Sequence, residues 1–175
     1  ESVVFGKINL ANIYIQEKKW QNAEGQLNQA IKLTKYPARG AYQSLGVIYM
    51  AEKKQEEAVA AWQKELKLYP NAGETHLNLG IFYFKNNKLK KAKAAFEKTI
   101  LSAPDNYAGY YGLAQVMEKE NKLADAIKLY QKALSLNPQD SSSYYFLGSL
   151  YARLNKPQAI DAFGKAIELN PKFAE

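Results

Sequence analysis

The apolar positions along the chain follow a helical spacing that returns at a fixed interval. A leucine precedes a small residue in each unit of the pattern, and successive leucines are 35, 34, 34 and 34 residues apart, at Leu10, Leu45, Leu79, Leu113 and Leu147. The large apolar residues around each leucine stand three or four positions apart, which places them on one face of a helix. The pattern therefore predicts one amphipathic helix around each leucine.

A second apolar set follows in every unit and predicts a second helix. It consists of an alanine, at Ala23, Ala58, Ala92, Ala126 and Ala159, and a bulky side chain four residues later, at Leu27, Trp62, Phe96, Tyr130 and Phe163. Polar turns such as AEKKQE and KNNKLK separate the two helices. Each unit closes on a proline, which ends a helix because it has no backbone N–H. The small residue after the leucine, such as Gly46 or Gly80, is expected to let the second helix approach the first closely.

This order of leucine, small residue, aromatic residue, alanine, aromatic residue and proline resembles the tetratricopeptide repeat (TPR) family, and the resemblance covers almost the whole chain. It implies an all-α fold, a right-handed superhelical solenoid of five TPR helix-turn-helix repeats. We expect a single TPR domain over residues 1–175, with repeats at residues 4–38, 39–72, 73–106, 107–140 and 141–173.

Composition narrows the class of protein. The chain has 175 residues, 47% of them hydrophobic, and no cysteine, so disulfides, thiolate zinc sites and cysteine nucleophiles are excluded. Its longest apolar stretches fall short of the roughly 20 residues that span a bilayer, and we expect no membrane span. The N-terminal residues carry no signal-peptide pattern. The compartment stays open, with the cytoplasm as the default and the periplasm as an alternative.

Residues with catalytic chemistry are sparse. The single histidine, His76, stands three positions before a core leucine and is expected to pack inside its repeat. Acidic pairs such as Glu56 and Glu57 lie beside lysines in polar turns, where solvated charges are expected. With one histidine and no cysteine, the sequence offers no His–Cys metal cluster. We predict a protein that is not an enzyme and that uses no metal or cofactor.

The TPR resemblance implies that the first helix of each repeat lines a concave face, where members of the family usually bind peptides. Positions two before, two after and five after each core leucine point away from the packing inside the repeat. Asn78, directly before a core leucine, is added because some TPR proteins hold a ligand backbone with asparagine there. The predicted partner-binding residues are Ile8, Asn12, Gln43, Val47, Met50, Leu77, Asn78, Ile81, Phe84, Tyr111, Gln115, Tyr145 and Ser149, with Ile15, Glu118 and Ala152 at the remaining positions.

Two interpretations of this largely apolar set are open. It forms a groove for an apolar or aromatic segment of a partner, with Tyr111 and Tyr145 as anchors, or several of its members pack against neighbouring repeats. The lysine, asparagine and arginine clamp that binds chaperone tails in one TPR subgroup is not reproduced, because a single asparagine is left at its positions. Heat-shock chaperone tails are therefore not the predicted ligand.

The charge of +7 concentrates in the turns within the repeats. A lysine edge could favour an acidic protein, an anionic membrane or nucleic acid, but glutamates are interleaved with the lysines, and a solvated edge without specific nucleic-acid binding is predicted.

We therefore predict a non-enzymatic scaffold or adaptor that binds a partner peptide or helix in the concave groove. The alternatives are a homo-oligomeric assembly module and the substrate-recognition arm of a larger protein. The residues after Pro171 are too few to form a helix that covers the apolar surface of the last repeat. We therefore expect a fragment of a longer protein or self-association through the ends of the chain.

Overall fold

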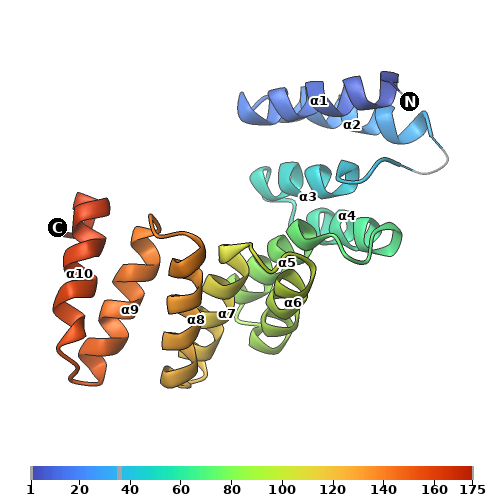
Figure 1. Cartoon of the computed structure of the whole chain (residues 1–175). Coiled ribbons are helices and arrows are strands. Elements are labelled where there is room, and N and C mark those ends of the chain that lie inside the picture. The colour runs from blue at the N-terminus through green and yellow to red at the C-terminus, as the bar shows by residue number, and fades with distance from the viewer. Residues whose placement is uncertain (1, 35–36, 175) are drawn as a thin grey trace. The chain divides into compact units, whose positions relative to one another are not determined.

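The computed structural model describes residues 2–34 and 37–174, and within them the chain is helical throughout (Figure 1). The described part contains ten α-helices, one short 3-10 helix and no strand. The helices are α1 (Ser2–Gln16), α2 (Trp20–Lys32), α3 (Ala41–Ala51), α4 (Gln55–Leu68), α5 (Gly73–Lys85), α6 (Leu89–Ser102), α7 (Tyr107–Lys119), α8 (Leu123–Leu136), α9 (Ser141–Arg153) and α10 (Gln158–Leu169), followed by the 3-10 helix η1 (Pro171–Ala174). The predicted all-α fold of helix pairs is confirmed, while the exact repeat boundaries stay a prediction.

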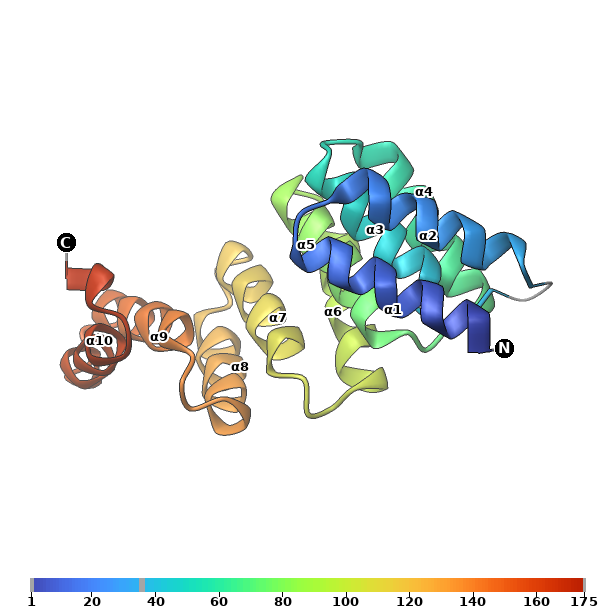
Figure 2. The same cartoon turned by 90° about the horizontal axis from the view of Figure 1, so that it is seen from above.

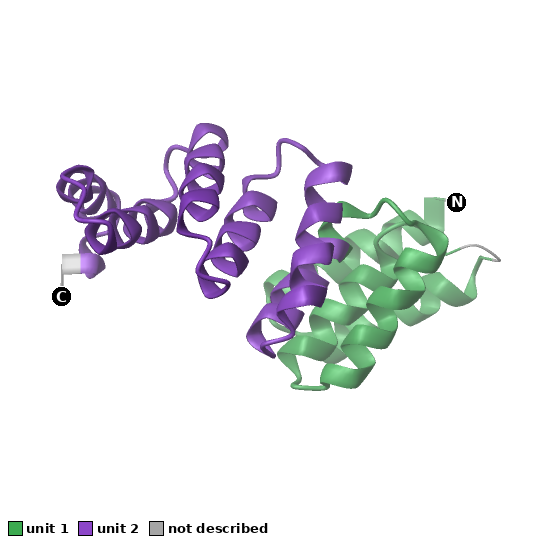
Figure 3. Ribbon diagram, turned by 90° about the horizontal axis from the view of Figure 1, so that it is seen from below, with its two compact units in different colours: residues 1–75 green, residues 76–175 purple. Residues whose placement is uncertain are grey.

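The helices group into two compact units, residues 1–75 (unit 1) and residues 76–175 (unit 2), coloured separately in Figure 3. Within unit 1, α1 packs on α2, α3 packs on α4, and α2 contacts α3. Within unit 2, α7 packs on α8 and α9 packs on α10, as Figures 1 and 2 both show. Because α6 also contacts α7 and α8 contacts α9, each helix pair of unit 2 is packed against the next along the chain.

One backbone conformation ends the first helix of every pair. A single residue in each turn has a positive φ between 52° and 63°, at Lys18, Lys53, Asn87, Asn121 and Asn155. The next residue then donates its N–H to a carbonyl five positions back, as in the bonds from Lys54 N to Tyr49 O and from Lys122 N to Met117 O, both 2.8 Å. This left-handed turn satisfies carbonyls at the helix end, and asparagine tolerates it better than most residues. It explains why asparagine occupies this position in three of the five turns.

Glycine allows the two helices of a pair to meet around an aromatic ring, as the sequence predicted. The ring of Phe96, which is fully buried, lies between Gly80 of α5 and Gly112 of α7. A Cβ atom built on Gly80 would stand 2.6 Å from Cε1 of Phe96, which is far inside van der Waals contact. Gly46 meets Trp62 in unit 1 and Gly148 meets Phe163 in unit 2 in the same way.

Unit 1 departs from the repeat pattern at one buried position. Three residues after its second-helix aromatic, the other repeats carry alanine or threonine, but the second repeat carries Glu65, which is fully buried. Its Oε1 accepts a bond from Gly40 N at 2.6 Å and its Oε2 accepts one from Tyr42 N at 3.2 Å. Gly40, with a φ of 90°, is the N-cap residue of α3 and has no side chain to cap it. Glu65 therefore caps α3 from α4, and its negative charge also suits a helix N-terminus.

A pair of glycine substitutions tests the packing argument. Gly112→Ala forces a methyl group into the ring of Phe96, so we expect the free energy of unfolding to fall by about 1–3 kcal/mol. Gly164→Ala, in α10, meets nothing within 4 Å and removes backbone freedom from the unfolded chain, so it should raise stability by about 0.5–1 kcal/mol. Urea unfolding followed by circular dichroism measures both, and equal effects would contradict the argument.

The cap supplied by Glu65 gives a second test. Glu65→Ala leaves two N–H groups of the α3 N-terminus without their acceptor, so we expect unfolding to become easier by about 1–3 kcal/mol. Gln63→Ala, on the exposed side of the same helix, is the matched control and should stay within about 0.5 kcal/mol of the wild type. Urea unfolding of both variants checks this, and an unchanged free energy of unfolding in Glu65→Ala would contradict the capping role of Glu65.

Candidate functional site

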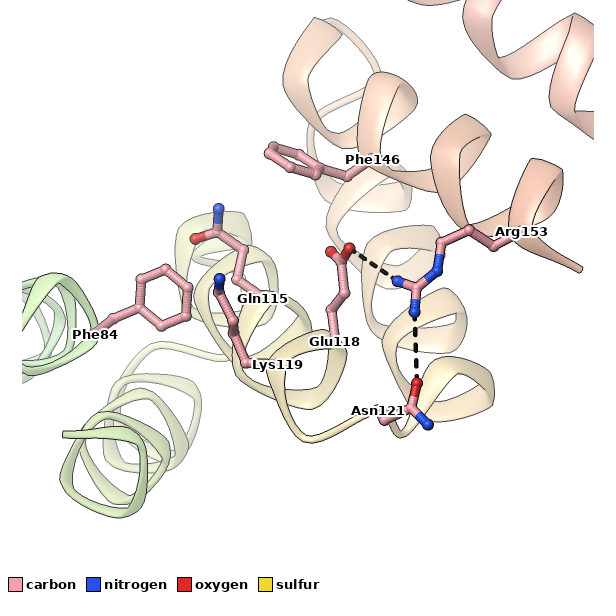
Figure 4. A pocket seen from close by; sticks show the side chains of 7 residues that line it. All are labelled: Phe84, Gln115, Glu118, Lys119, Asn121, Phe146 and Arg153. Carbon is pink, nitrogen blue, oxygen red and sulfur yellow. Dashed lines mark hydrogen bonds and ion pairs between the residues drawn. The ribbon is translucent and has the colours of Figure 1, made fainter. Parts of the chain in front are cut away.

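Unit 2 contains a pocket of about 490 Å³ between the first helices of its repeats. It is lined by Phe84 from α5, by three residues of α7 and the turn residue that follows, and by two residues of α9 (Figure 4). The full lining is Phe84, Gln115, Glu118, Lys119, Asn121, Phe146 and Arg153. Three successive first helices thus contribute side chains to one space.

The positions of these residues in the repeat explain why they meet. Phe84 and Glu118 stand five residues after their core leucines, and Lys119 and Arg153 stand six after theirs. Since side chains at equivalent positions of equivalent helices point in equivalent directions, successive repeats bring them to the same side of unit 2. Figure 4 shows Phe84, Gln115 and Lys119 facing one another, with Glu118 directed toward Arg153.

An aromatic cluster supports one wall of the pocket. The rings of Tyr130 and Phe146 are stacked, with centroids 5.9 Å apart and planes within 5°. Tyr111 packs edge-on against both, at 5.8 Å from Tyr130 and 6.0 Å from Phe146. Because Tyr130 is fully buried, this cluster holds the ring of Phe146 in one place.

Four of the polar side chains that line the pocket form hydrogen bonds within the chain. Gln115 Nε2 donates to the hydroxyl of Tyr111 at 3.2 Å. Arg153 donates from Nη1 to Glu118 Oε1 and from Nη2 to Asn121 Oδ1, both at 3.4 Å. These side chains are partly exposed, so the Arg153–Glu118 pair contributes about 0–1 kcal/mol and can be exchanged for a ligand at little cost.

Both tyrosines of the cluster remain neutral at physiological pH. Burial, together with the smaller effect of the negative charges of Asp140 and Glu118, raises the pKa of Tyr111 to about 12. Burial is also the main cause that raises the pKa of Tyr130, with Glu118 adding to it. The pocket wall therefore presents aromatic rings and hydroxyl groups rather than tyrosinate charge.

The structure brings together only part of the predicted groove. Phe84 and Gln115 line the pocket with Glu118. Tyr111 does not line it, but its hydroxyl accepts a hydrogen bond from Gln115. Tyr145 stacks on Phe173, with ring centroids 4.9 Å apart, so one of its faces is covered within the chain. The role of each of these residues in partner binding stays a prediction.

The remaining predicted residues lie outside this pocket. Leu77 is 8% exposed and belongs to the core of unit 2, whereas Ile81 is 40% exposed. Asn78 and Ser149 are partly buried. In unit 1, Asn12 is exposed and four residues are half-buried, namely Ile8, Gln43, Val47 and Met50. A second pocket, of about 330 Å³ in unit 1, lies between α2, α3 and α4 and is lined by none of them.

Four pocket residues were missed from the sequence: Lys119, Asn121, Phe146 and Arg153. A signal for two of them was present, because the sixth residue after the core leucine is basic in three successive repeats, at Lys85, Lys119 and Arg153. Phe146 directly precedes Leu147, at the position equivalent to Asn78, where only an asparagine predicts contact with a ligand backbone. Asn121 lies in the turn between α7 and α8, where the sequence predicts solvated polar residues.

Two other features are absent from the residues that the structure describes. No helix among them is both long and apolar enough to cross a membrane. No cluster of three or more histidine, cysteine, aspartate or glutamate side chains suited to a metal ion occurs in the same part of the chain.

Comparisons with known proteins agree with the fold. Two models described as tetratricopeptide repeat match the chain, one over residues 8–73 and 77–141 and the other over residues 129–161. Curated protein sequences give no match. Together with the helix pairs, the family models confirm the predicted TPR helix-turn-helix fold.

Among solved structures, MamA from Desulfovibrio magneticus RS-1 aligns with a TM-score of 0.79 at 22% identity, over 98% of this chain and 97% of that one. PilF of Pseudomonas aeruginosa aligns with a TM-score of 0.83 at 19% identity, over 99% of this chain and 76% of that one. YrrB, described as a TPR protein with an unusual peptide-binding site, aligns with a TM-score of 0.72 at 22% identity, over 94% and 85%. At these identities the likeness concerns the fold.

The raised pKa of Tyr111 gives a test of the aromatic cluster. The unfolded chain loses this proton near pH 10 and the folded chain near pH 12, so the stabilisation is complete below pH 10 and is lost as the pH rises to about 12. We expect Tyr111→Phe to show a smaller fall in stability across this range than the wild type. Urea midpoints measured at several pH values check it, and parallel curves for the two proteins would contradict it.

Proposed function

We propose that this chain, which belongs to the tetratricopeptide repeat family, is a protein-interaction scaffold that binds a segment of a partner protein in the pocket of unit 2. Members of the family are generally non-enzymatic interaction modules, and membership supports the same class of function for this chain. The finer proposal is that the partner enters between Phe84 and Phe146.

The observation that carries the proposal is the composition of the pocket wall. Ligand sites are concave and mainly apolar, with a few polar groups that fix orientation. Here two phenylalanine rings offer contact to an apolar or aromatic side chain. Next to them, the amide groups of Gln115 and Asn121 can both donate and accept hydrogen bonds, which suits the N–H and C=O groups of a peptide backbone.

The rigidity of the pocket wall supports binding as well. Because Phe146 is held by Tyr130 and Tyr111, ordering this ring on binding would require little loss of side-chain entropy. YrrB, which shares the fold, is described as having a peptide-binding site, and this chain would use the fold for the same class of ligand.

Truncation of one wall tests the proposal. Peptides are selected from a random phage-displayed library on the wild-type chain, and their dissociation constants are measured by fluorescence anisotropy. Phe84→Ala should weaken them about tenfold or more, because a buried phenylalanine contributes about 1.5–3 kcal/mol. Phe5→Ala is the matched control, since Phe5 is exposed on α1 in unit 1, and it should leave the dissociation constant unchanged.

Equal affinities of wild type and Phe84→Ala, or no selected peptide at all, would exclude the pocket as the binding site. Light scattering over a range of concentrations separates a foreign partner from a second copy of the chain. If the wild type self-associates and Phe84→Ala is a folded monomer, the pocket serves the homo-oligomeric alternative.

A further inference from the structure

Within the part of the chain that the structure describes, the lysines in three of the five turns form ion pairs of the same kind, and those in the other two turns do not. A lysine follows each left-handed turn residue, and in three turns a glutamate two positions earlier neutralises it. The pairs are Lys19–Glu17 at 2.7 Å, Lys54–Glu52 at 2.8 Å and Lys122–Glu120 at 2.6 Å. Between α5 and α6 the glutamate position holds Asn86, whose Nδ2 donates to Phe82 O at 2.9 Å. Lys88 therefore lacks the glutamate that Lys19, Lys54 and Lys122 have, as does Lys156, which follows Leu154 by two positions.

The same turn gathers further lysines without acidic residues among them. Residues 85–93 contain Lys85, Lys88, Lys90, Lys91 and Lys93, and no aspartate or glutamate. Lys93 pairs with Glu97 at 3.9 Å, and within the described residues the other four take part in no ion pair. These four exposed residues, Lys85, Lys88, Lys90 and Lys91, are called the lysine cluster below. The α3–α4 turn, residues 52–57, has the opposite character, with Glu52, Glu56 and Glu57 against Lys53 and Lys54.

One member of the lysine cluster is the sequence neighbour of a residue that lines the pocket of unit 2. Lys85 directly follows Phe84, the residue that forms the α5 wall. On the other side of that wall, Lys119 of α7 faces Phe84 in the close-up view (Figure 4). Lys119 is exposed and forms no ion pair in the described part of the chain. An apolar wall is thus flanked by cations on two helices.

Such an arrangement is unfavourable for the free protein and favourable for an acidic ligand. The positive end of the α6 macrodipole repels cations, and Lys90 and Lys91 lie in the first turn of this helix. Carboxylates of a bound segment would relieve this repulsion, and the positive potential would speed their approach. A phosphate polymer fits less well, because it carries a negative charge on every unit, whereas a peptide can place an apolar side chain next to Glu118 and its carboxylates on the lysines.

We infer that unit 2 takes an acidic segment of a partner protein, with an aromatic or large aliphatic side chain between Phe84 and Phe146 and carboxylates on Lys119 and the lysine cluster. This inference rests on the proposed function and specifies the partner by its chemistry. Its two parts, the apolar anchor and the acidic flank, use different residues and can be tested separately.

The test compares peptide pools selected on two chains, the wild type and the double variant K85E/K88E. Peptides from the wild type should be enriched in aspartate and glutamate next to a large apolar residue, and this enrichment should vanish on the variant. The most enriched peptide, labelled with fluorescein, should bind K85E/K88E and K119E about tenfold more weakly than it binds the wild type. Its binding to the wild type should weaken as salt is added, because salt screens the charges. K53E/K54E, in the α3–α4 turn, is the matched control and should bind like the wild type.

The possible failures are distinguishable. If the selected peptides depend on Phe84 but show no acidic enrichment and no loss with K85E/K88E, the inference is wrong while the proposed function stands. If no selected peptide depends on Phe84 for binding, the proposed function and the inference are both wrong. A single-stranded DNA oligonucleotide and vesicles containing phosphatidylserine are the remaining probes, and binding of either as tightly as the peptide, with the same dependence on Lys85 and Lys88, would overturn the protein partner in favour of a general anionic surface.

Discussion

The close approach of two helices around one aromatic ring is the contact on which the rest of this protein depends. Gly80 and Gly112 leave no side chain between their helices and Phe96, so the ring is buried from both sides. Tyr130 is buried at the equivalent place in the next repeat. Because protein interiors are packed as densely as organic crystals, a contact of this kind fixes the spacing and direction of the helices that make it.

The candidate site follows from that packing. Tyr130 is a core residue of its own repeat, and it also stacks on Phe146, which lines the pocket. The scaffold and the pocket therefore share an aromatic cluster, and the same side chains that hold unit 2 together hold the wall of the pocket in place. The polar groups, by contrast, stand on exposed helix ends, where charge can vary without disturbing the core.

The turns show how a repeat can keep its backbone while its charge changes. All five turns place one residue in the left-handed conformation at the same position, and all form the same hydrogen bond back into the first helix. Around this constant geometry the α3–α4 turn carries three glutamates, whereas the α5–α6 turn carries lysines and asparagines. Since the turn side chains are exposed, their charges can change without disturbing the packing of the helices.

The sequence by itself determined the helix pairs, their interval and the need for glycine beside the aromatic residues, because these follow from helical periodicity and from residue size. It also placed Phe84 and Gln115 on the side of their helices that faces the pocket. Only the tertiary structure decided that Phe146 and Arg153 join them, that Leu77 is buried, and that Glu65 caps a helix 25 residues earlier in the chain. The physical reason is that periodicity gives the direction of a side chain from its own helix, whereas its neighbours depend on how the next helix is packed.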